Sequence, residues 1–99
     1  MKLVIEKNKI NMAAEQFLRR AGYAYIQDRQ TGNDSFVRRL GSNFYPRFHM
    51  YLEEEAKKII FNLHLDQKKP SYAGAHAHNA EYDGEVVEQE VERLRSLLS

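Results

Sequence analysis

The segment FYPRFHMYLEEEAKKIIFNLHLD, residues 44–66, carries the clearest structural pattern in this chain. Apolar residues recur at every second position in two runs, on either side of a charged stretch at residues 53–58. The alternating residues are Phe44, Pro46, Phe48, Met50 and Leu52 in the first run and Ile59, Phe61, Leu63 and Leu65 in the second. Such alternation is typical of a strand with one buried face. Two adjacent runs of this kind predict an antiparallel hairpin.

The residues before this hairpin predict three further strands. Extended structure is favoured at residues 23–30 and 35–40, and the Thr-Gly-Asn-Asp sequence at 31–34 between them tolerates turn geometry. These two segments predict a first hairpin. Near the start of the chain, the β-branched-rich run at residues 3–5 predicts a short strand.

Two helices are predicted from apolar stripes at helical spacing. Asn11 is placed to cap the first helix and Gly22 to end it, while Asp83 is placed to cap the second. The stripes consist of Ala14, Phe17, Leu18 and Ala21 in the first helix and of Val87, Val91, Leu94 and Leu98 in the second.

The predicted order is therefore β-α-β-β-β-β-α, in a single α+β domain at residues 1–99. An antiparallel sheet with both helices packed on one face would bury both helical stripes and the apolar side of the strands. This order of elements resembles one half of the TATA-box-binding-protein fold. The resemblance implies a curved sheet with helices on its convex side and an exposed concave face, but it carries no function.

Composition narrows the class of protein. A hydrophobic content of 42% suits one modest core, and a net charge of +1 argues against strong, non-specific attachment to nucleic acid. The absence of cysteine excludes disulfides and thiolate metal sites. The apolar run at residues 3–5 is too short to span a bilayer, so we expect a cytoplasmic protein with no membrane partner.

The polar side of the second hairpin is the first candidate site. Alternation places on this side Tyr45, Arg47, His49 and Tyr51 from one strand and Ile60, Asn62, His64 and Asp66 from the next. A tight turn would bring His49 beside, or diagonally across from, Asn62 and His64. Without any function, these residues would simply form the solvated side of a half-exposed sheet. A solvated side, however, more often consists of Lys, Glu and Thr than of Tyr, Arg, His and Asn.

The functional interpretation is a non-enzymatic binding module that needs no cofactor. Tyrosine and arginine offer stacking surfaces and donors to phosphate or carboxylate, and histidine and asparagine can read hydrogen-bonding edges. Nucleic acid is the first candidate partner, and a protein partner would also fit. The expected contact residues are Tyr45, Arg47, His49, Tyr51, Asn62 and His64, with Tyr72 from the segment at 66–83.

That segment, DQKKPSYAGAHAHNAEYD, is long, aperiodic and contains two histidines. If it folds over the sheet, His76 and His78 could join His49 and His64 around a divalent transition metal such as zinc, and Asp66 or Asp83 could replace one ligand. This alternative predicts a metal-binding protein or a metal-dependent hydrolase. The segment could equally be a purely structural loop.

Three further features of the sequence bear on function and assembly. No nucleophile turn, phosphate-binding glycine loop or dinucleotide fingerprint occurs, which favours binding over catalysis. An uncovered sheet face or edge strand would also allow a homodimer. For the arginine pairs at 19–20 and 38–39, we expect solvation or pairing with Glu88, Glu90 or Glu92 on the last helix.

Overall fold

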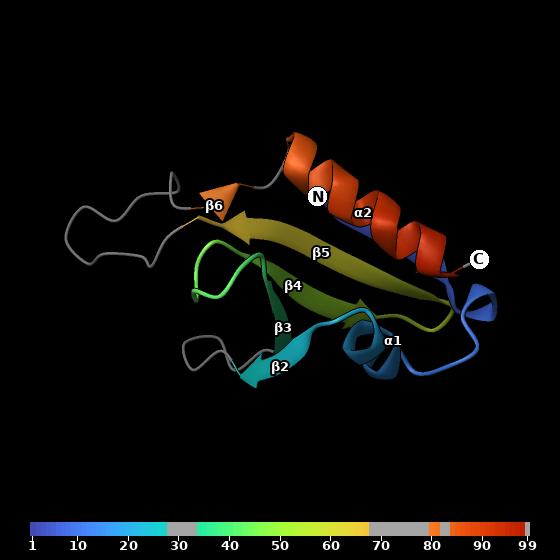
Figure 1. The fold of residues 1–99 in the computed structure, drawn as a ribbon. Coiled ribbons are helices and arrows are strands. Elements are labelled where there is room, and N and C mark those ends of the chain that lie inside the picture. Colours follow the sequence, from blue (N-terminus) through green and yellow to red (C-terminus); the bar gives the residue numbers. More distant parts are fainter. Residues whose placement is uncertain (28–33, 68–79, 82–83, 99) are drawn as a thin grey trace.

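The computed structural model describes residues 1–27, 34–67, 80–81 and 84–98 (Figure 1). Its elements follow the predicted order, with a short 3-10 helix and a two-residue strand in addition. In chain order they are β1 (Lys2–Glu6), η1 (Lys7–Lys9), α1 (Ala14–Arg20), β2 (Ala24–Gln27), β3 (Asp34–Arg39), β4 (Arg47–Glu54), β5 (Lys58–Asp66), β6 (Ala80–Glu81) and α2 (Glu85–Leu98).

The strands form one antiparallel sheet in the order β1-β5-β4-β3-β2. The predicted α+β class is confirmed. The long segment at 66–83 is not all loop, however, because Ala80 and Glu81 pair with Asp66 and Leu65 and extend the sheet beside β5. Most of that segment, and the predicted Asp83 cap, lie outside the described residues.

Both helices pack on the same face of the sheet. Phe17 and Leu18 of α1 and Val87, Val91 and Leu94 of α2 join one core cluster with the apolar side of the strands. The strand residues in this cluster are Leu3, Phe36, Phe48, Met50, Ile59, Phe61, Leu63 and Leu65. This arrangement leaves the alternate strand residues on the face that carries no helix.

The prediction that Asn11 caps α1 is wrong. The helix begins only at Ala14, and Ala13 occupies the cap position in an extended conformation with no side-chain cap hydrogen bond. Ile10 and Met12 pack against the core, which holds this part of the chain out of the helix. The other end is as expected, because Gly22 follows the helix with a φ of +102° that favours glycine.

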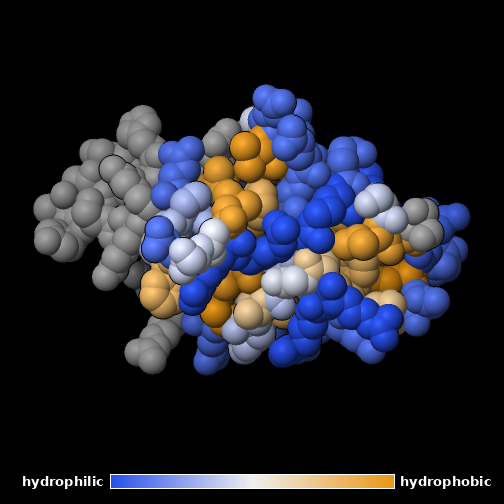
Figure 2. Space-filling view, viewed as in Figure 1, coloured by the Kyte–Doolittle hydropathy of each residue, from blue (hydrophilic) through white to orange (hydrophobic). Residues whose placement is uncertain are grey.

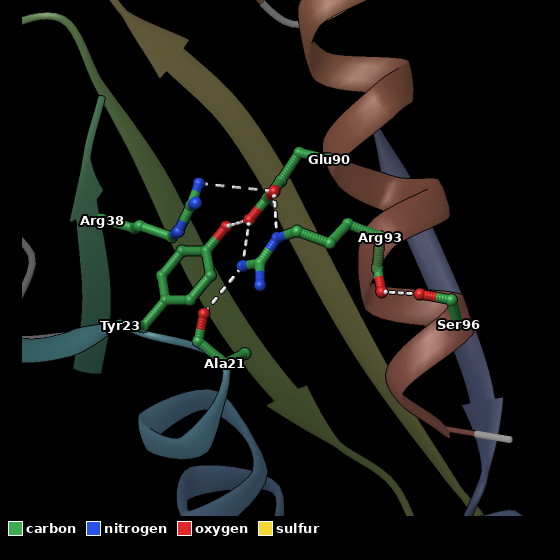
Figure 3. A network of polar contacts seen from close by, with 6 residues as sticks. All are labelled: Ala21, Tyr23, Arg38, Glu90, Arg93 and Ser96. Atoms are coloured by element: carbon green, nitrogen blue, oxygen red, sulfur yellow. Dashed lines mark hydrogen bonds and ion pairs between the residues drawn. The ribbon is translucent and has the colours of Figure 1, made fainter. Parts of the chain in front are cut away.

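A buried polar network fixes α2 to the rest of the domain (Figure 3). The Glu90 carboxylate accepts a 2.6 Å hydrogen bond from the Tyr23 hydroxyl and pairs with Arg93 at 2.8 Å and with Arg38 at 3.5 Å. Arg93 also donates to the Ala21 carbonyl at 2.7 Å. Of the predicted pairings between arginine and the last helix, the one between Arg38 and Glu90 is therefore confirmed.

The same network perturbs two ionisable groups. Burial, together with the hydrogen bond to Glu90, raises the pKa of Tyr23 above its ordinary value of 10.0. The hydrogen bonds to Glu90 raise the pKa of Arg93 as well. The network therefore consists of a neutral phenol and a carboxylate shared by two guanidiniums.

The exposed side of α2 is largely hydrophilic (Figure 2), although Val86 and Leu97 of this helix are also exposed. This agrees with a helix that buries one stripe and solvates the rest. Among the described residues, no helix combines the length and the apolar character needed to cross a membrane.

Candidate functional site

The register of β4 and β5 brings the predicted polar residues together. His49 lies directly opposite His64, Arg47 opposite Asp66 and Tyr51 opposite Asn62. All six side chains belong to the face that carries no helix, because they alternate with the core residues Phe48, Met50, Leu63 and Leu65. We call these six residues the polar face.

Asp66 is the centre of the polar face. His49 Nδ1 lies 3.1 Å from one carboxylate oxygen and His64 Nε2 lies 2.8 Å from the other. Arg47 Nε lies 3.4 Å from the oxygen that also faces His49. His49, His64 and Asp66 can each offer one ligand atom to a metal ion such that the three atoms lie within 4.8 Å of one another.

These contacts keep Asp66 ionised at neutral pH. Burial alone would raise the pKa of this carboxyl, but the hydrogen bonds to His49 and His64, and the charge of these rings when protonated, outweigh that effect. The pKa of Asp66 is consequently held below its ordinary value of 3.8. A permanent negative charge therefore sits between two imidazoles.

The two histidines are not open to solvent. His49 and His64 are 8% and 9% exposed, whereas an open binding face would expose them. Their rings pack together with centroids 4.8 Å apart, and the Tyr51 ring stacks on His49 at 4.6 Å. Because the two histidines are buried, a large partner can contact less of the polar face than the sequence suggests. Its accessible part includes the half-buried residues Arg47, Tyr51 and Asn62.

One nitrogen of this cluster is unsatisfied. His49 Nε2 is buried and has no hydrogen-bond partner in the described part of the chain. Leaving a buried polar atom unpaired typically costs about 1–3 kcal/mol. Stability alone does not explain a histidine in this position, and such unpaired groups are a reason to look for function.

Beside Asp66, two arginines lie against aromatic rings, one of an exposed and one of a half-buried residue. Arg39 is directly opposite Arg47 on the neighbouring strands β3 and β4, so both side chains project from the same face. The Arg39 guanidinium lies 4.1 Å from the Phe44 ring centroid, and that of Arg47 lies 4.7 Å from the Tyr45 ring centroid. We call these four residues the arginine–aromatic cluster.

A shallow surface hollow includes His64 in its lining. It has a volume of about 390 Å³ and is lined by Met1, Lys2, Tyr51, Asn62, Leu63 and His64. The hollow gives small molecules a route to the edge of the histidine pair.

The structure thus brings six of the predicted contact residues to one region: Tyr45, Arg47, His49, Tyr51, Asn62 and His64. Tyr72, His76 and His78 lie outside the described residues. The sequence does not indicate which side of its strand Arg39 occupies. Phe44, predicted as part of the apolar side of the hairpin, instead lies before β4 and is 63% exposed. The register of β3 against β4 identifies Arg39 as a neighbour of Arg47, and the contact with Arg39 brings Phe44 to the same region. Comparison with known proteins gives no further guidance, because no family model, curated protein or solved structure matches this chain.

Proposed function

We propose that this protein binds a divalent transition-metal ion through His49, His64 and Asp66. The observation that carries the proposal is the convergence of His49 Nδ1 and His64 Nε2 on the two oxygens of one carboxylate, at 3.1 and 2.8 Å. Ligand atoms that share one zinc or iron ion lie roughly 3.0–3.4 Å apart, given metal–ligand bonds of about 2.0–2.2 Å. Since the three ligand atoms lie within 4.8 Å of one another, side-chain movements of up to about 1.5 Å would bring them around one ion.

The chemistry of the donors is also suitable. Two imidazoles and one carboxylate form the ligand set of many zinc, iron and nickel sites, and three protein ligands leave positions for water or another ligand. Metal binding requires each imidazole to be free of a proton at its ligand nitrogen, so metal affinity should rise with pH. Arg47 beside Asp66 opposes a cation electrostatically, which favours a site that also admits an anion.

Metal content tests the proposal directly. Protein purified without a histidine tag would be loaded with zinc, nickel, manganese or ferrous ion in turn, and bound metal would be measured after desalting. We expect about one ion per chain, and at 100 times the dissociation constant about 2.7 kcal/mol of stabilisation against unfolding. His49→Ala and Asp66→Asn should abolish both effects.

Asp34→Asn is the matched control, because Asp34 is an exposed aspartate that binds the Tyr25 hydroxyl at 2.8 Å. A double variant, His76→Ala with His78→Ala, tests whether the segment at 66–83 supplies further ligands. Absence of stoichiometric metal, or equal retention by Asp66→Asn and wild type, would refute the proposal.

A further inference from the structure

We propose that the arginine–aromatic cluster of Arg39, Phe44, Tyr45 and Arg47 is a binding site for a nucleoside phosphate, with the phosphate held between the two guanidiniums and the base stacked on Phe44. This inference rests on different observations from those behind the metal site. The ligand class is a phosphate ester that carries a planar base, either as a free nucleotide or within a single strand.

The first observation is the placement of two like charges. Arg39 and Arg47 are direct cross-strand partners, an arrangement that is destabilising when nothing neutralises it. Arg39 makes no ion pair with any described residue, although it is exposed. Arg47 contacts Asp66 through Nε at 3.4 Å, which is longer than the roughly 2.7–2.9 Å of a typical charge-assisted hydrogen bond. An anion between the two side chains would relieve the repulsion.

The second observation is how the guanidiniums are held. Each one lies against an aromatic ring, Arg39 against Phe44 and Arg47 against Tyr45, at 4.1 and 4.7 Å from the ring centroids. Stacking of this kind orients a planar guanidinium while leaving its N–H groups free to donate. Guanidiniums so oriented suit the several oxygens of a phosphate.

The third observation selects a nucleoside phosphate over a simple anion. Phe44 is 63% exposed although one side of its ring is occupied by Arg39, so much of the ring remains open to solvent. A base could stack there and extend the arginine–phenylalanine stack by one layer. Inorganic phosphate or an acidic side chain would make no use of this surface.

Fluorescence anisotropy with a labelled ten-nucleotide oligothymidylate and a matching oligouridylate tests the inference. The titrations are run in 50 mM salt with a metal chelator, so that failure of the metal site cannot affect them. We expect measurable binding, a loss of at least ten-fold for Arg39→Gln and a loss of about five-fold or more for Phe44→Ala. Removing one phosphate contact should also reduce the salt slope by about 0.7.

The chain offers matched controls. Arg20→Gln removes an exposed arginine from α1, and Leu40→Ala removes an apolar residue that is 44% exposed beside Arg39. Both variants should bind within two-fold of wild type. Competition by thymidine monophosphate as strong as that by the oligonucleotide would assign the site to free nucleotides, and weaker competition would assign it to a single strand. Equal losses in Arg20→Gln and Arg39→Gln, equal competition by inorganic phosphate or polyglutamate, or no binding at all would overturn the inference.

Discussion

Neutralising Glu90 should destabilise this domain far more than neutralising Glu92. Both glutamates lie on α2, and each pairs with the arginine three residues later at 2.8 Å. They differ in burial, because the Glu90 side chain is 3% exposed and that of Glu92 is 68% exposed. The comparison of Glu90→Gln with Glu92→Gln therefore isolates the effect of burial on one kind of ion pair.

The magnitude follows from the partners that Glu90 would lose. Breaking a buried ion pair costs about 3–5 kcal/mol, because the remaining charge stays desolvated. Here Arg38 and Arg93 are about one-third exposed, so water recovers part of that cost. We therefore expect Glu90→Gln to cost about 2–3 kcal/mol, whereas the exposed Glu92 pair contributes less than about 0.5 kcal/mol.

Urea unfolding followed by far-ultraviolet circular dichroism measures both values. With a denaturant dependence of about 1–3 kcal/mol per molar urea, Glu90→Gln should lower the midpoint by about 0.7–3 M and Glu92→Gln by much less. Unfolding free energies within about 0.5 kcal/mol of each other for the two variants would show that burial of Glu90 adds nothing, and the reasoning would fail.

Two further predictions concern the stability of the fold, one for the buried polar network and one for the core. The pKa of Tyr23 is raised in the folded state. The protonated Tyr23 hydroxyl therefore contributes fully to the free energy of unfolding below pH 10.0, and this contribution is lost as the pH rises above that value. Urea titrations above pH 10 should therefore show wild type losing stability faster than Tyr23→Phe, by up to about 1.4 kcal/mol per pH unit, and parallel curves would contradict this. In the core, Phe61→Ala should cost about 3–5 kcal/mol because Phe61 is fully buried, as judged by urea unfolding. Val4→Ala on the neighbouring strand, where the side chain is 52% exposed, should cost less than about 1 kcal/mol, and equal losses would refute the core assignment.

The fold could be predicted because its main signals are local. The stripe of Val87, Val91 and Leu94 defines α2 within a few turns, and the alternation around Phe48 and Phe61 defines the central strands. Asn11 shows the limit of local signals. A capping side chain competes with tertiary packing, and here the packing of the partly buried Ile10 and Met12 against the core outweighs the capping preference of Asn11.

The candidate site was only half predictable because it depends on register. Alternation identifies which side of the hairpin His49, His64 and Asp66 occupy, but the charged stretch at residues 53–58 does not reveal where the turn falls. In the structure β4 continues to Glu54 and β5 begins at Lys58, which sets His49 opposite His64 and Arg47 opposite Asp66. A shift of a single residue would have moved one strand's polar side chains to the core face. The position of Arg39 was still harder to predict, because its neighbours depend on a second register, that of β3 against β4.

Arg47 connects the two proposed sites. It lies opposite both Arg39 and Asp66, and its only ion pair with a described residue is the 3.4 Å contact with Asp66. A divalent ion bound by Asp66 would compete for the carboxylate oxygen that now faces Arg47, and would thereby release this guanidinium toward a phosphate. The charge of the ion would itself add to the attraction for an anion at close range. Because such coupling is reciprocal, whatever the metal adds to phosphate affinity, the phosphate must add equally to metal affinity. If both proposed sites exist, the Asp66 carboxylate, shared by Arg47 and two histidines, would couple the binding of a cation to the binding of an anion on one face of the sheet.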